Sequence, residues 1–82
     1  MSHEQGTMTG KEKLVYMANQ IAAFFGSAMP QDQAVAGIAD HLNKFWEVRM
    51  RRQLLEIIDA GGVGLSPLVI EAASQVRKPA LI

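Results

Sequence analysis

The segment from residue 34 to residue 58 reads AVAGIADHLNKFWEVRMRRQLLEII, with no proline or glycine between its two halves. Its apolar residues recur at spacings of three and four, first as Ala34, Val35, Ile38, Ala39, Leu42, Phe45 and Trp46, then as Met50, Leu54, Ile57 and Ile58. This spacing is typical of amphipathic helices. If one helical phase is continued through the segment, the centre of the apolar stripe jumps by about 110°. We therefore predict two helices with a break or sharp kink at 46–48.

The preceding segment predicts another helix with a wide apolar face. Its stripe consists of Leu14, Met17, Ala18, Ile21 and Phe25, widened by Val15, Ala22 and Phe24. A stripe covering about half of the helix circumference indicates contact with more than one neighbour. Thr9 and Glu12 have the spacing of a capping box at the helix start. GSAMP at 26–30 predicts a turn, and Pro30 suits the first turn of the next helix.

The segment after residue 58 predicts a helix end followed by a short last helix. Glycine readily adopts the left-handed conformation that ends helices, as expected for GGVG at 61–64. Ser66 and Pro67 fit the N-cap and first helical position, and the last stripe consists of Leu68, Val69, Ala72, Ala73 and Val76. No strand-like alternation occurs, so we predict an all-α fold, a small bundle of three to four short helices. Residues 11–78 form one helical domain between an N-terminal tail at 1–10 and a C-terminal tail at 79–82.

Composition excludes several classes of protein. The chain has 82 residues, 49% hydrophobic and 20% charged, and its 8 basic and 8 acidic residues cancel. A neutral chain lacks the basic surplus of general nucleic-acid or anionic-membrane binders. Without cysteine it has no disulfide, thiolate metal site, iron–sulfur ligand or cysteine nucleophile. No apolar run reaches bilayer length, and MSHEQGTMTG does not resemble a secretory signal. We expect a cytoplasmic protein.

Candidate catalytic and metal-binding residues are sparse. Asp40, His41 and Glu47 could be considered as metal ligands or acid–base groups, but a catalytic metal needs three protein ligands with supporting contacts, and no such spacing occurs. GGVG follows a helix rather than the strand that a phosphate-binding loop requires. The serines at 27, 66 and 74 have no histidine nearby in the sequence. We expect this chain to be non-catalytic and to bind no cofactor or metal.

The segment 44–52, KFWEVRMRR, is the strongest candidate for partner binding. It holds four of the eight basic residues and the only tryptophan. Arginines at a helix start oppose the helix dipole, and tryptophan and arginine are enriched at interface hot spots. The candidate residues are Lys44, Phe45, Trp46, Arg49, Arg51 and Arg52. On a helical wheel Arg51 lies on the apolar side, whereas Arg49 and Arg52 face outward. Core positions for Phe45 and Trp46 with solvated arginines remain an alternative, as do arginine contacts to bases or phosphates.

Three stretches of the chain stand out: KLVYMANQIAAFF (13–25), AVAGIADHLNKFWEVRMRRQLL (34–55) and GGVGLSPLVIEAA (61–73). Within them the blocks MANQIAxFF, ADHLxKFW and RMRxQLL, in that order, are distinctive. With these blocks the chain resembles the delta subunit of cytoplasmic NAD-dependent formate dehydrogenases over roughly residues 13–73. In the family pattern a proline often occupies the position of Val48, which fits a helix break after Trp46. Residues 1–10 fall outside the resemblance.

The resemblance implies an accessory subunit of an enzyme that oxidises formate to carbon dioxide and reduces NAD. In this family the alpha subunit carries a molybdenum or tungsten bis-pterin centre and iron–sulfur clusters, while beta and gamma subunits carry FMN and further clusters. The delta subunit associates with the alpha subunit and supports its maturation, cofactor insertion or stability. Neither nucleic acid nor membrane is an implied partner. A self-associating helical regulator or adaptor with a small basic patch is the alternative function.

Overall fold

Four α-helices follow one another in this computed structural model, which describes residues 9–77. They are α1 (Gly10–Ala28), α2 (Gln31–Phe45), α3 (Val48–Asp59) and α4 (Pro67–Ala72), and a 3₁₀ turn, η2 (Ala73–Gln75), continues α4. No strand occurs in the described range, so the predicted all-α bundle of three to four short helices is confirmed. Most of the predicted N-terminal tail, at 1–8, and the predicted C-terminal tail at 79–82 lie outside the described residues.

The start of α1 has the predicted capping box. The Thr9 hydroxyl accepts a hydrogen bond from the Glu12 backbone N–H at 3.0 Å, and the Glu12 carboxylate accepts one from the Thr9 N–H at 2.9 Å. Reciprocal bonds of this kind satisfy two of the amide donors that a helix start leaves without partners. Thr9 and Gly10, which were assigned to the tail at 1–10, therefore belong to the start of α1.

The turn between α1 and α2 is shorter than predicted. The helix continues through Gly26 to Ala28, so only Met29 and Pro30 connect α1 to α2. Pro30 is the N-cap of α2 rather than part of its first turn. A Cβ atom on Gly26 would lie 2.9 Å from Leu68 Cδ1. This glycine therefore allows α1 to approach Leu68 closely instead of ending the helix.

The predicted break between the second and third helices is confirmed. α2 ends at Phe45, and the next two residues, Trp46 and Glu47, have extended backbones with ψ of 131° and 164°. α3 then begins at Val48. The change in direction allows the apolar faces of both helices to point into one core, which a straight helix could not achieve.

The loop between α3 and α4 depends on glycine. Gly61, Gly62 and Gly64 have positive φ angles of 117°, 66° and 88°. The Gly61 N–H donates to the Ile58 carbonyl and the Gly62 N–H donates to the Ile57 carbonyl, the paired bonds of a Schellman motif. Ser66 caps α4 by accepting a hydrogen bond from the Leu68 N–H, and Pro67 is its first residue. The predicted helix end and restart are confirmed.

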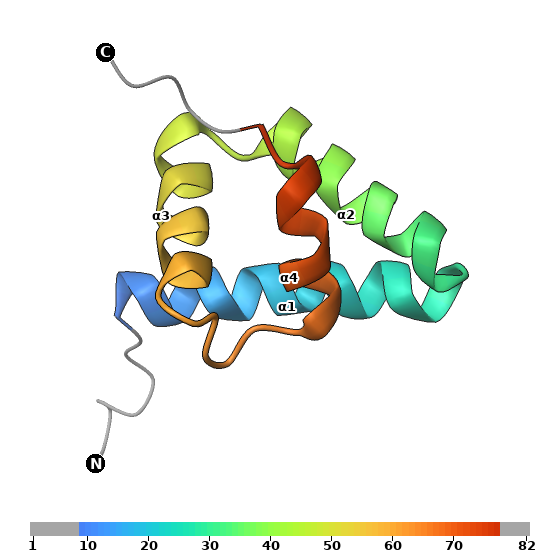
Figure 1. Ribbon diagram of the computed structural model, residues 1–82, viewed down its shortest axis with the longest axis horizontal. Helices are drawn as coiled ribbons and strands as arrows, with labels where there is room; N and C mark the ends of the chain where they lie inside the picture. Colours follow the sequence, from blue (N-terminus) through green and yellow to red (C-terminus); the bar gives the residue numbers. More distant parts are fainter. Residues whose placement is uncertain (1–8, 78–82) are drawn as a thin grey trace.

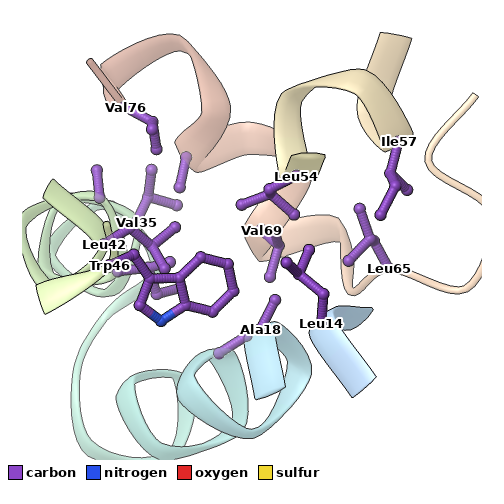
Figure 2. Packing of buried hydrophobic residues seen from close by; sticks show 14 residues of the cluster. Leu14, Ala18, Val35, Leu42, Trp46, Leu54, Ile57, Leu65, Val69 and Val76 are labelled. Carbon is purple, nitrogen blue, oxygen red and sulfur yellow. The ribbon is translucent and has the colours of Figure 1, made fainter. Parts of the chain in front are cut away.

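The helices pack around α1, which lies along one side of the molecule (Figure 1). α2 runs back beside the C-terminal half of α1, and α3 lies at the N-terminal end of α1 (Figure 1). α4 lies between α2 and α3 (Figure 1). α1 contacts α2, α3 and α4, as its wide apolar stripe predicted. The core lies where these helices converge, with Trp46 among Ala18, Leu54 and Val69 (Figure 2).

Candidate docking surface

The residues predicted for partner binding divide into an exposed and an internal group. Lys44 and Phe45 end α2, and Arg49, Arg51 and Arg52 lie in the first turns of α3. Four of the side chains are exposed: Lys44, Phe45, Arg49 and Arg52. Trp46 is buried and Arg51 is half-buried. The prediction that Arg49 and Arg52 face outward while Arg51 lies on the apolar side is confirmed.

Trp46 is a core residue. Only 5% of it is exposed, and it packs in the main hydrophobic cluster (Figure 2). Its side chain therefore has little surface to offer a partner, although Trp46 was among the residues predicted for partner binding. The alternative of a core position holds for Trp46 but not for its neighbour Phe45, which is 71% exposed.

Arg51 links the corner between α2 and α3, formed by Trp46 and Glu47, to Arg77, the last described residue. Its Nη1 donates to the Trp46 carbonyl at 2.8 Å, and its Nε donates to the Arg77 carbonyl at 3.3 Å. The planar guanidinium can make both bonds at once because its donors point in fixed directions. This half-buried arginine therefore has an internal structural role.

The exposed basic side chains differ in whether a carboxylate lies close to them. Lys44 Nζ lies 3.2 Å from Asp40 Oδ2, an exposed pair one helical turn apart. Within residues 9–77, Arg49 and Arg52 have no carboxylate within salt-bridge distance. α3 also has no acidic residue in its first turn and no side-chain cap. The positive charges there oppose the helix dipole, at a cost of about a few tenths of a kcal/mol each.

Four rings from α1 and α2 form a continuous aromatic surface, defined here as Phe24, Phe25, His41 and Phe45. Successive ring centroids along this series are separated by 5.3, 6.3 and 4.9 Å. Phe24 is 66% exposed, which shows that its assignment to the buried stripe of the first helix was wrong. Met17, assigned to the same stripe, is also exposed. The His41 ring lies between those of Phe25 and Phe45 in this series.

A shallow groove of about 260 Å³ lies beside these rings. Its lining consists of Gln20, Ile21, Phe24, Phe25 and His41. Phe25 packs on Gly37, where an added Cβ would lie 2.8 Å from the ring, so this glycine permits close contact between α1 and α2. The groove is smaller than the roughly 300–1,000 Å³ typical of small-molecule sites.

Most residues considered for catalysis or metal binding have other contacts, whereas Glu47 is exposed at the N-cap of α3. Asp40 pairs with Lys44, and His41 packs against phenylalanine rings. The Ser27 hydroxyl donates to the Phe24 carbonyl and the Ser74 hydroxyl to the Glu71 carbonyl, while Ser66 is the cap of α4. No group of three or more potential metal ligands occurs in residues 9–77.

Two asparagines have structural roles that the sequence patterns did not predict. Asn19 Nδ2 donates to the Gly64 carbonyl at 2.9 Å, and its Oδ1 accepts from the Ser66 N–H at 2.8 Å. Asn43 repeats the pattern, donating to the Gln75 carbonyl at 3.0 Å and accepting from the Arg77 N–H at 2.7 Å. The two side chains thus hold the chain on either side of α4 and η2. The sequence signal that could have indicated these roles is a single asparagine beside the apolar stripe of each helix.

The described residues define a small all-helical protein with an exposed aromatic surface and a basic start to α3. No helix in the range 9–77 has the length and apolar character needed to cross a membrane. The family model for the NADH-dependent formate dehydrogenase delta subunit, FdsD, matches residues 13–73. The chain belongs to this family, as its resemblance indicated. Comparisons with curated proteins and with solved structures give no match.

Proposed function

We propose that this protein is a non-catalytic subunit that docks on the catalytic alpha subunit of an NAD-dependent formate dehydrogenase and supports its maturation, cofactor insertion or stability. Membership of the delta-subunit family carries the proposal, because it places the chain in a multi-subunit formate dehydrogenase. The exposed aromatic side chains support a binding role, since large apolar groups on a small protein's surface commonly mark interaction sites.

The docking residues proposed are Lys44, Phe45, Arg49 and Arg52. Phe45 supplies a large apolar group that is 71% exposed, and the arginines supply charges without an internal carboxylate partner in residues 9–77. Trp46 and Arg51 act from inside by fixing the corner on which these residues stand. In this proposal the chain itself carries no cofactor. The molybdenum or tungsten centre belongs to the alpha subunit, and beta and gamma subunits complete the cytoplasmic complex.

The test is affinity purification of the tagged full-length protein from its native cells, with mass and metal analysis of what accompanies it. Recovery of a molybdenum- or tungsten-containing dehydrogenase in fixed ratio would support a permanent subunit. Recovery of cofactor-poor alpha subunit alone would support a maturation role. A protein recovered only as a homodimer would contradict the proposal and favour a self-associating regulator.

Charge reversal then tests the docking residues. We expect R49E/R52E to reduce recovery of the alpha subunit strongly. The matched control K11E/K13E reverses two exposed charges at the start of α1. If both double variants retain the alpha subunit equally, the arginines of α3 do not contribute to docking.

A further inference from the structure

The groove beside Phe24 has the size and chemistry of a site for one large apolar side chain. Its volume is about 260 Å³, and its lining residues include isoleucine and two phenylalanines but no carboxylate, lysine or arginine. Interface centres are depleted in charged residues and enriched in aromatic ones. A groove below the usual size of small-molecule sites is better suited to an anchor side chain of another protein.

The exposed aromatic area is smaller than the area that a stable homodimer needs. Phe24 and Phe45 are 66% and 71% exposed. With about 200 Å² for each phenylalanine, they present roughly 270 Å² together. A standard interface buries about 800 Å² on each partner, and stable homodimers commonly bury more. The aromatic surface is therefore large enough for the centre of an interface, but its rim must come from other surfaces.

The arginines of α3 provide one such neighbouring surface. Phe45 and Arg49 are four residues apart, so their Cα atoms lie within about 15 Å of each other. His41 contacts Phe45, with ring centroids 4.9 Å apart, and also lines the groove. The groove is thus connected through His41 and Phe45 to the end of α2, just before the arginine-rich start of α3.

We infer that the groove receives a single large apolar side chain, such as leucine or phenylalanine, from the partner subunit, and that carboxylates near this anchor face Arg49 and Arg52. The inference rests on the proposed function and specifies the chemistry of the docking segment. The apolar anchor supplies most of the affinity, because it is removed from water. The charge pairs at the rim set orientation and association rate.

The experiment titrates purified alpha subunit against the immobilised full-length protein and its F24Q variant. We expect F24Q to weaken binding by about 30-fold, the effect of losing a strong interface contact. The matched control is Y16Q, which removes another exposed aromatic side chain from α1 that does not line the groove. We expect the control to change affinity by less than about threefold. Circular dichroism checks that both variants remain helical.

A second arm tests the carboxylates. R49Q/R52Q should weaken binding at low salt and flatten the dependence of affinity on salt, because exposed charge pairs are screened by ions. K11Q/K13Q is the matched control. Wild-type protein that fails to bind the alpha subunit would overturn the proposed function itself. Wild-type binding with equal affinities for F24Q and Y16Q would overturn the anchor site alone, and an unchanged salt dependence in R49Q/R52Q would overturn the acidic partner segment.

Discussion

The connections before and after α3 are stabilised by different interactions. The corner between α2 and α3 consists of Trp46 and Glu47, whose extended backbone conformations suit any residue. It is held by the buried indole and by the Arg51 hydrogen bond to the Trp46 carbonyl. The loop between α3 and α4 instead contains three glycines with positive φ and begins with backbone hydrogen bonds.

This contrast shows which substitutions each connection should tolerate. In the corner, side chains determine the conformation, so truncating them should be harmful while the backbone accepts many residues. In the glycine loop the backbone determines the conformation, so adding even a methyl group should be harmful. Substitutions in the two connections should therefore differ in their effects on stability.

Truncation of Trp46 should have the largest effect. We expect W46A to lower the free energy of unfolding by about 3–5 kcal/mol, the usual cost of removing a large buried aromatic side chain. Urea denaturation measures the change. Total stability for a chain of this size is only about 4–12 kcal/mol, so W46F, with a smaller expected loss, provides a measurable second variant.

The matched control for this prediction is the preceding residue. Phe45 is 71% exposed, so F45A should change stability by less than about 0.5 kcal/mol. Equal losses in W46A and F45A would contradict the role of the indole in holding the corner.

Addition of a methyl group to the loop should have the next largest effect. Gly62 has a φ of 66°, and a Cβ there would lie 3.0 Å from Ile70 Cδ1. We expect G62A to lower the free energy of unfolding by about 1–2 kcal/mol, because the left-handed conformation is unfavourable for residues with a Cβ. G10A is the control, since a Cβ on Gly10 would meet nothing within 4 Å. Similar melting temperatures for both variants would show that the loop does not require glycine at position 62.

The asparagines that hold α4 at its two ends should differ in importance. The Ser66 N–H that donates to Asn19 is partly buried, whereas both hydrogen bonds of Asn43 are exposed. Water can replace exposed bonds more easily, so N19A should lower the free energy of unfolding by about 1–2 kcal/mol and N43A by about half as much. The gain in helix propensity on changing asparagine to alanine is shared and cancels in the comparison. A larger loss in N43A than in N19A would contradict this ranking.

The features of the fold that could be predicted from the sequence depend on residues close together in the chain. The capping box at Thr9, the cap at Ser66 and the helix end at Gly61 depend on residues within a few positions of one another. The break at Trp46 was predictable because the apolar stripe changes phase there. Each of these signals is contained in one helix or one turn.

Long-range packing explains the features that the sequence did not predict. The periodic stripe of α1 places Phe24 near its apolar face, but it does not say how far the neighbouring helices extend, and Phe24 remains 66% exposed. Gly26 resembles a helix end, yet its use depends on the distant Leu68. Each asparagine hydrogen bond joins a side chain to a backbone group more than 30 positions away, and no side-chain pattern in the sequence indicates that group.

The candidate docking site could be predicted only in part, because some of its features also depend on long-range packing. Helical phase alone correctly separated Arg49 and Arg52 from Arg51. It could not identify the acceptors of Arg51, which are two backbone carbonyls, or the groove formed where α1 and α2 meet. Partner binding by the exposed residues stays a prediction for the experiments above.

A conservative change at Arg51 should have the smallest effect and is the finest test of the corner. The R51K variant keeps the positive charge but loses the planar group that donates to both the Trp46 and Arg77 carbonyls. We expect it to lower the free energy of unfolding by about 0.5 kcal/mol, the lower end of the net value of a hydrogen bond, because lysine can still donate to one of the two carbonyls. R52K is the matched control, because Arg52 is exposed and should tolerate lysine. If R51K and R52K have the same stability, charge rather than hydrogen-bond geometry is what the corner requires from Arg51.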